Sequence, residues 1–400
     1  MRRFALVSLL PLVAACDLSA LTGASGTETT TGSATDSAST PTVVTTTSWT
    51  DTTSATPLLE TDSGDQEGWS FSQHPCTGNR ADTMWLDDED TIWLGCGSTS
   101  DGTGLYLSLD GGRSWGTPRT SPAGWFDTFR VSSISRSADG LLYVAGTDTA
   151  SSARVVSMDA AGQLGEVLDA GTQLGTSFHV GTFRRNSAGV AVAESLTGPD
   201  VLARLDDGER FEDARTGTAG RQILDLVLFE DEFYAVGSTI SQPPTIFLPP
   251  QDGVDAGTGF RFDVVEFRAD GLYGFDGELW GLDVDEGGLV AAGVNQDRGH
   301  GIVLWADDPQ DLAGYQMLDL GGRYGEPTWM RGACRDGATM VAVGEFSRLG
   351  EGLVLRSDDG GATWDDITPD RLPPVQRCAL LEDGSLMVAG GEGLFARLDD

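Results

Sequence analysis

Residues 357–364 read Ser-Asp-Asp-Gly-Gly-Ala-Thr-Trp, and residues 108–115 read Ser-Leu-Asp-Gly-Gly-Arg-Ser-Trp. Both stretches follow the pattern S-x-D-x-G-x-x-W at every position. Ser and Asp side chains bind the backbone amides of a tight turn, Gly permits a positive φ there, and Trp can bury its ring beneath the turn. Each stretch therefore predicts a structural hairpin turn, formed by Ser108, Asp110, Gly112 and Trp115 and by Ser357, Asp359, Gly361 and Trp364.

A second pattern repeats along the chain, a short apolar run that ends in a small residue. The seven runs occupy residues 92–97, 142–146, 190–193, 233–237, 289–293, 340–344 and 386–390. Their ends lie 44 to 56 residues apart, and a period near 40–50 residues built from short strands is typical of propeller blades. The sequence therefore predicts an all-β fold over residues 67–400, a seven-bladed β-propeller of four-stranded antiparallel blades.

The end of the chain predicts how this ring closes. Residues 393–400 begin a hairpin whose second half is missing, and residues 68–71 read Gly-Trp-Ser-Phe. We expect the early segment to form the outer strand of the last blade, because this closure leaves no open sheet edge.

The first 15 residues predict a secretory signal peptide. Two Arg residues precede an apolar run over residues 4–15, which is shorter than the roughly 20 residues that span a bilayer. The run ends Val13-Ala14-Ala15-Cys16, which resembles the lipobox of bacterial lipoproteins. The resemblance implies that Cys16 carries lipid and that the protein lies in the bacterial cell envelope on the extracytoplasmic side. The alternative is an ordinary secretory signal followed by a chance Cys.

Residues 16–66 are expected to be the lipidated Cys and a disordered tether. Sixteen of residues 17–66 are Thr and eight are Ser, with almost no large apolar side chains. Such a composition buries too little apolar surface to offset the entropy of ordering.

Charge and composition exclude several classes of function. The chain has 61 acidic and 25 basic residues, a net charge of −36, which argues against nucleic acid as a partner. It contains no Lys and only three His, so lysine chemistry, a histidine metal site and a Ser-His-Asp triad are not expected. We expect no cofactor and no metal.

Four cysteines besides Cys16 predict two disulfides, for which three pairings are possible. Cys334 and Cys378 lie 10 and 12 residues before the glycines that end their apolar runs. Both should therefore lie on the innermost strands of adjacent blades, and we expect them to be bonded. Cys76–Cys96 would then be a local second bridge.

The S-x-D-x-G-x-x-W motif is the Asp-box, and with its repeats the chain resembles two groups of propellers. One is the photosystem II assembly and stability factor with its bacterial relatives, which implies a non-enzymatic protein- or peptide-binding scaffold. The other, more distant, is the sialidases, which implies a glycan-binding protein or glycoside hydrolase. Sialidases have six blades and an F/Y-R-I-P motif before the first Asp-box, whereas the nearest likeness here, residues 371–373, follows the last one. We therefore expect the non-enzymatic binding scaffold rather than the hydrolase, and we assign no catalytic residue.

Arg residues that precede the apolar runs predict a binding face. The approaches to innermost strands converge on one end of a propeller's channel, and an Arg fork suits carboxylates and phosphates. The expected ligand is an acidic peptide segment or another anionic ligand. The expected partner is an envelope protein, a peptide or a glycan. The alternative is that each Arg pairs with a nearby Asp or Glu. The candidate residues are Arg130, Arg184, Arg221, Arg331, Arg377, Trp125 and Trp329.

Overall fold

The computed structural model describes twelve stretches of the chain, which belong to one compact unit, Thr61–Asp400. The predicted signal peptide, Cys16, the predicted tether and Arg221 lie outside the described residues. The described stretches are residues 68–76, 81–97, 104–148, 152–170, 180–188, 191–195, 202–206, 210–213, 222–237, 243–249, 262–266 and 276–399.

Consecutive antiparallel strands form separate sheets, and each sheet extends outward from an innermost strand. The first sheet contains β2 (Ala81–Leu86), β3 (Thr91–Cys96) and β4 (Gly104–Leu109). The next contain β5 (Arg130–Arg136), β6 (Leu142–Thr147), β7 (Ala153–Met158) and β8 (Leu164–Asp169); β9 (Val180–Arg185), β10 (Ala191–Ser195), β11 (Leu202–Asp206) and β12 (Arg210–Asp213); and β13 (Ile223–Phe229), β14 (Glu232–Gly237), β15 (Thr245–Leu248) and β16 (Asp263–Glu266). The last contain β17 (Gly277–Asp285), β18 (Gly288–Asn295), β19 (His300–Ala306) and β20 (Gln316–Asp319); β21 (Thr328–Asp336), β22 (Thr339–Phe346), β23 (Glu351–Ser357) and β24 (Asp365–Asp366); and β25 (Val375–Leu380), β26 (Leu386–Gly390), β27 (Leu394–Leu398) and β1 (Trp69–Gln73).

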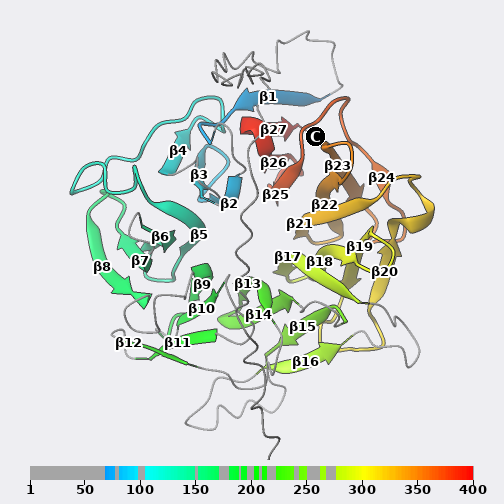
Figure 1. Cartoon of the computed structure of the whole chain (residues 1–400), viewed down its shortest axis with the longest axis horizontal. Coiled ribbons are helices and arrows are strands. Elements are labelled where there is room, and N and C mark those ends of the chain that lie inside the picture. Colours follow the sequence, from blue (N-terminus) through cyan, green and yellow to red (C-terminus); the bar gives the residue numbers. More distant parts are fainter. Residues whose placement is uncertain are drawn as a thin grey trace, which may run out of the picture. The chain divides into compact units, whose positions relative to one another are not determined.

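The sheets are arranged around a centre as in a β-propeller (Figure 1). Each innermost strand contacts the innermost strands of the sheets on either side, so that β2, β5, β9, β13, β17, β21 and β25 form a closed ring. The apolar runs of the sequence form the second strands, and the core lies between neighbouring sheets.

The prediction of seven four-stranded blades is wrong. Six blades have four strands, whereas β2-β3-β4 is a three-stranded sheet within the described residues. After β4 only Gly116 continues the pairing, with Leu107. The chain then leaves this edge, because Ser121 pairs with Gln163 of the neighbouring blade and Phe126 becomes buried in the core between the two sheets. The chain therefore buries apolar surface between the two sheets at this point and does not form a regular fourth strand.

Closure by the N-terminal strand is confirmed. β1 pairs antiparallel with β27, from Trp69 opposite Leu398 to Gln73 opposite Leu394. The last blade therefore combines one strand from the beginning of the described chain with three from its end (Figure 1).

The two S-x-D-x-G-x-x-W segments form the same turn. Ser357 Oγ donates to Asp359 Oδ1 (2.9 Å) and accepts from Gly361 N (2.9 Å), and Asp359 Oδ1 also accepts from Thr363 N (2.8 Å). Ser108 and Asp110 make the equivalent bonds in the other segment. In each case the Trp packs on an aromatic ring of the preceding sheet, Trp364 on Trp305 and Trp115 on Phe395. Residues 206–211, Asp-Asp-Gly-Glu-Arg-Phe, are a degenerate copy of the motif with Phe in place of Trp, and they lie partly outside the described residues.

All seven innermost strands have an irregularity in pairing near their beginning. One residue is skipped between Met330 and Gly332 on β21, for example, and another between Val375 and Arg377 on β25. The same shift occurs in the pairing of β2, β5, β9, β13 and β17. Bulges of this kind redirect side chains, and here they do so at one level around the channel.

Candidate functional site

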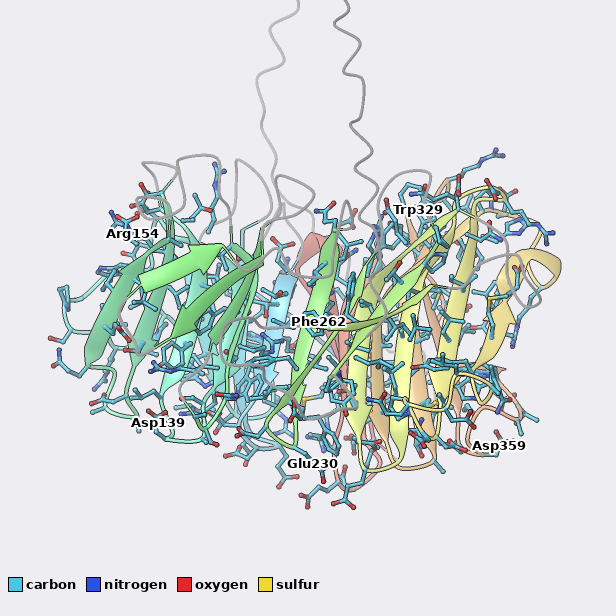
Figure 2. The ribbon with its side chains drawn as sticks, turned by 90° about the horizontal axis from the view of Figure 1, so that it is seen from below. Asp139, Arg154, Glu230, Phe262, Trp329 and Asp359 are labelled. Carbon is cyan, nitrogen blue, oxygen red and sulfur yellow. A yellow bond between two sulfur atoms is a disulfide. The ribbon has the colours of Figure 1, made fainter. Side chains whose placement is uncertain are left out.

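The innermost strands all begin at one end of the propeller, which we call the entry end, and lead into tight turns at the other, which we call the turn end. Trp329, near the start of β21, lies at the entry end, whereas Asp139 and Glu230 lie in turns at the turn end (Figure 2). The predicted site residues divide between the entry end and the channel.

At the entry end, Arg331 lies between two indole rings. Its guanidinium carbon is 4.2 Å from the ring centre of Trp280 and 4.8 Å from that of Trp329. Arg331 also donates through Nη2 to Glu345 Oε1 (2.9 Å), and Trp280 Nε1 donates to Glu278 Oε2 (2.9 Å). These contacts fix a cationic and aromatic surface, which we call the Arg331 platform (Trp280, Trp329, Arg331 and Glu345).

Trp329 is the accessible part of this platform. Its side chain is 37% exposed, and its ring lies 6.1 Å from that of Trp280 at an interplanar angle of 71°. Trp280 was not predicted from the sequence. It is the residue that the bulge of β17 skips, and bulge positions cannot be read from the apolar pattern.

The other two predicted residues near the entry end, Arg130 and Trp125, are not part of the Arg331 platform. Arg130 is the first residue of β5 and is exposed. Trp125 is half-buried, and its ring packs against Phe126 and Phe129 at 5.0 and 5.1 Å. Trp125 therefore belongs to the apolar cluster between the first two sheets rather than to a binding face.

Arg184 and Arg377 line the central cavity, which has a volume of about 890 Å3. Arg184 Nη1 donates to Ser133 Oγ (2.9 Å) and to the Phe183 carbonyl (2.9 Å). Arg377 Nε donates to the Asp82 carbonyl (2.8 Å), and its Nη1 donates to the carbonyls of Gln376 (3.2 Å) and Arg331 (3.4 Å). All these acceptors are neutral oxygens.

Two carboxylates line the same cavity and connect neighbouring innermost strands. Asp225 Oδ2 on β13 accepts from Leu282 N of β17 (3.1 Å), and Asp283 Oδ2 on β17 accepts from Arg335 N of β21 (2.8 Å). Burial raises the pKa of Asp225, although Arg377 and Arg184 oppose this shift. Burial also raises the pKa of Asp283, to about 7.

The sequence held a signal for these two carboxylates. They lie 12 and 10 residues before the glycines that end their apolar runs, the same spacings that placed Cys378 and Cys334. The predicted cationic face rested on Arg and aromatic residues alone, so it included neither carboxylate.

Three further Arg residues of the innermost strands pair with carboxylates, as the alternative interpretation expected. Arg136 makes a two-pronged contact with Asp87, Arg185 Nη1 lies 3.6 Å from Glu166 Oε2, and Arg335 Nε lies 3.2 Å from Asp285 Oδ1. These pairs stabilise the turn end and are not available to a ligand.

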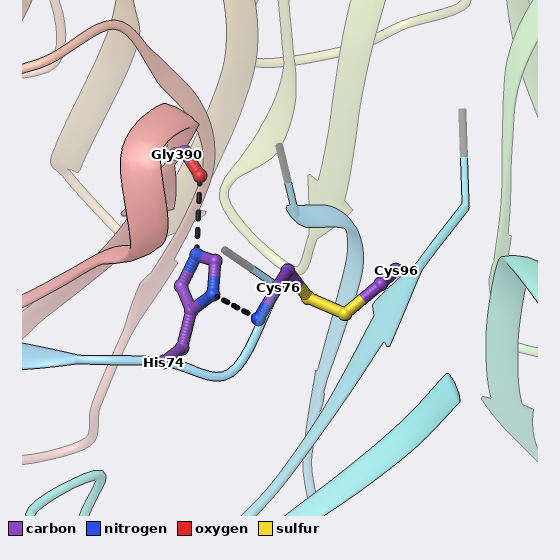
Figure 3. The surroundings of a disulfide bond; sticks show 4 residues. All are labelled: His74, Cys76, Cys96 and Gly390. Carbon is purple, nitrogen blue, oxygen red and sulfur yellow. Dashed lines mark hydrogen bonds between the residues drawn. A yellow bond between two sulfur atoms is a disulfide. The ribbon is translucent and has the colours of Figure 1, made fainter. Parts of the chain in front are cut away.

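The Cys76–Cys96 disulfide is present, with a Cα–Cα distance of 5.5 Å (Figure 3). It connects the segment after β1 to the end of β3. His74 reinforces this junction, because its Nδ1 accepts from Cys76 N (3.1 Å) and its Nε2 donates to the Gly390 carbonyl (3.1 Å) (Figure 3). The imidazole is fully buried, and this burial lowers its pKa to about 4.

The predicted Cys334–Cys378 disulfide is absent. Both residues lie on neighbouring innermost strands, β21 and β25, as expected, but both are free thiols. Burial, followed by the adjacent Cys378 thiol, raises the pKa of Cys334. Since the thiolate is the species that forms disulfides, a raised pKa opposes oxidation of this pair.

Membrane-spanning helices and clustered metal ligands are both absent from the described stretches. Within them, no helix is long and apolar enough to span a membrane, and no group of three or more His, Cys, Asp or Glu side chains is arranged to hold a metal ion.

Comparisons with known proteins show which solved structures have a similar fold. No family model and no curated protein matches the sequence. Among solved structures, YCF48 bound to D1 peptide matches with 18% identity and a TM-score of 0.57, covering 84% of this chain and 96% of that one. YCF48 from Cyanidioschyzon merolae matches with 15% identity and a TM-score of 0.56, covering 83% and 99%. The GH74 enzyme of Niastella koreensis matches with 11% identity and a TM-score of 0.56, covering 82% and 53%. At such low identities the likeness extends to the β-propeller fold alone.

Proposed function

We propose that this protein is a lipid-anchored, extracytoplasmic β-propeller of the bacterial cell envelope, and that it acts as a non-enzymatic scaffold by binding a peptide segment of a partner protein. The observation that carries the proposal is the Arg331 platform, in which an ion-paired guanidinium is held between two indoles and one indole is 37% exposed. Fixed aromatic and Arg side chains of this kind are enriched where proteins bind their partners.

The charge distribution favours a peptide with acidic and apolar residues. The chain as a whole carries −36, whereas the entry end presents the exposed Arg130 at the start of β5 and, on β21, Arg331 against the exposed ring of Trp329. An apolar side chain can stack on Trp329, while a carboxylate farther along the peptide can pair with the exposed Arg130. That YCF48 has been solved with a bound D1 peptide supports peptide binding by a propeller of this kind.

A displayed peptide library tests this site. We expect the full chain to select peptides whose affinity falls about tenfold or more in Trp329→Ala, because exposed Trp anchors contribute strongly to binding. Leu312→Ala is the matched control, since it removes an exposed apolar side chain (57% exposed) in the segment between β19 and β20. Fluorescence anisotropy with the selected peptides gives the dissociation constants. Equal affinities for Trp329→Ala and the parent would contradict the proposal.

A glycan array and a fluorogenic sialoside assay provide the alternative outcome. Exposed indoles also stack on sugar rings, and one structural neighbour is a glycoside hydrolase of family GH74. Glycan binding or sialoside hydrolysis that is lost in Trp329→Ala, without peptide binding, would replace the scaffold by a glycan-binding or hydrolytic function.

Lipid anchoring has its own test. The proposal predicts that Cys16→Ser abolishes labelling by a fatty-acid probe and releases the protein from the membrane fraction, because acyl chains supply the membrane affinity. Ala14→Gly, a conservative change before the Cys, should remain acylated. A Ser variant that still labels and partitions into detergent would contradict the anchor.

A further inference from the structure

The central cavity is separate from the Arg331 platform. Its lining includes Arg184, Asp225 and Arg377, whereas Trp280, Trp329 and Arg331 do not contribute to it. The cavity extends to the turns that follow β2 and β25. A volume near 890 Å3 is within the range of sites that hold small molecules.

The hydrogen-bond donors of this cavity are incompletely used. Arg184 donates only through Nη1, and Arg377 only through Nε and Nη1, in the stretches that the structure describes. Neither guanidinium lies within 4 Å of a carboxylate there, in contrast to Arg136, Arg331 and Arg335. The remaining nitrogen atoms of both groups are therefore available to a ligand.

A buried hydroxyl adds an independent observation. Thr182 lines the same cavity, its side chain is 7% exposed, and its Oγ1 has no hydrogen-bond partner among the described residues. It lies two residues before Arg184, in the bulged part of β9, and both residues line the cavity. An unpaired buried hydroxyl costs roughly 1–3 kcal/mol, and an oxygen ligand beside Arg184 would satisfy it.

The charges indicate what kind of ligand fits. Arg184 and Arg377 repel one another, and both are attracted to the carboxylate of Asp225. Asp283 lies in the same cavity, and burial raises its pKa to about 7, so it is partly protonated at neutral pH. The two guanidiniums with these two carboxyl groups therefore carry at most one positive charge, which suits a monoanion better than a dianionic phosphate. Apolar lining residues such as Met84, Val227 and Leu282 favour a carbon chain beside that charge.

We infer that the central cavity binds a carboxylate group between Arg184 and Arg377, with Thr182 donating a further hydrogen bond. The carboxylate can belong to a small aliphatic acid or to the C-terminus of a peptide. This inference is independent of the entry-end peptide site, because it uses none of that site's residues.

Matched acids and amides test the inference on the full-length chain by isothermal titration calorimetry. Butanoate is compared with butanamide, and a tripeptide with a free C-terminus is compared with its C-terminal amide. We expect at least one acid to bind at least tenfold more tightly than its amide. Butanoate binding identifies a small acid as the source, and binding of the tripeptide alone identifies a peptide terminus. If neither acid binds more tightly than its amide, the inference is wrong.

Substitutions locate the site. Arg184→Met and Arg377→Met should each weaken acid binding about tenfold or more, because each removes a charge-assisted hydrogen bond. Arg348→Met is the control, since Arg348 has a side chain that is 73% exposed, outside the cavity. Arg377→Lys keeps the charge and the fold while losing the planar fork, so it should bind the acid more weakly than the parent. Unchanged binding in Arg377→Lys together with unchanged binding in a folded Met variant would overturn the assignment.

Discussion

His74 illustrates how one side chain couples distant parts of the chain. Its two ring nitrogens connect Cys76, in the segment after the closing strand, to Gly390, the last residue of β26. The geometry requires the neutral imidazole, with the proton on Nε2, because Nδ1 accepts a hydrogen bond from Cys76 N. Protonation of Nδ1 would place two donors against each other in a buried site.

This arrangement predicts a loss of stability in acid. The pKa of His74 is lowered from 6.5 to about 4, so its contribution to the free energy of unfolding is fully present above pH 6.5. The contribution decreases as the pH falls from 6.5 to 4, because only the unfolded chain gains a proton over that range. The shift corresponds to about 3 kcal/mol. His74→Gln should lower stability at pH 7.5 by about 1–3 kcal/mol and remove this part of the pH dependence.

Urea denaturation at pH 7.5 and at pH 4.5 measures both quantities. A parent protein and a Gln variant that lose the same stability between these two pH values would rule out His74 as the source of the acid sensitivity.

At the scale of an element, the S-x-D-x-G-x-x-W turn depends on two glycines in different ways. Gly360 and Gly361 both have a positive φ, +70° and +88°. A Cβ on Gly360 would meet nothing within 4 Å, whereas a Cβ on Gly361 would overlap the Trp305 indole. The first glycine supplies backbone freedom alone, and the second also supplies space for the ring of the preceding sheet.

Paired substitutions separate these two effects. Gly360→Ala should cost about 1–2 kcal/mol from the left-handed backbone conformation. Gly361→Ala should cost about 1–3 kcal/mol more, because the added methyl group forces Trp305 to move in a packed core. Thermal unfolding of both variants gives the comparison. Equal losses of stability in the two variants would show that packing against Trp305 contributes nothing to the need for glycine at position 361.

The turns and second strands could be predicted from the sequence because their signals are local. Ser357, Asp359 and Gly361 satisfy one turn within a few residues. The platform and the channel depend instead on the bulges in the innermost strands, and a shift of one residue moves side chains to the other face. The sequence pattern therefore predicted that Arg331 and Arg377 lie on innermost strands. It did not predict that Arg331 lies at the entry end and Arg377 in the channel. The missing fourth strand after β4 likewise depends on where Phe126 is buried.

For the whole molecule, the closing strand completes the last blade. β1 supplies its outermost strand, and the rings of Trp69 and Phe71 stack 6.2 Å apart against the core of that blade. Without β1, the edge of β27 would present unpaired backbone groups to other chains.

Truncation tests the importance of closure. A chain of residues 74–400 should unfold at a lower temperature than a chain of residues 68–400 and should associate through the edge of β27. Light scattering during thermal unfolding measures both effects. The two chains share Cys76, Cys96 and His74, so any difference between them arises from β1. A shorter chain that stays monomeric and equally stable would show that β1 is dispensable.

The position of the disulfide also determines how the domain would respond to mechanical load. In a chain held at Cys16 as proposed, a pull along the tether reaches the propeller ahead of Trp69, at the outer end of β1. The pairs from Trp69–Leu398 to Gln73–Leu394 would then separate one at a time, and the hydrogen bonds of His74 would follow. Two residues later the pull meets Cys76, whose covalent bond to Cys96 transfers the force into β3. Detachment of the chain would stop there, so that the loss under tension would be limited to β1 and the contacts of His74.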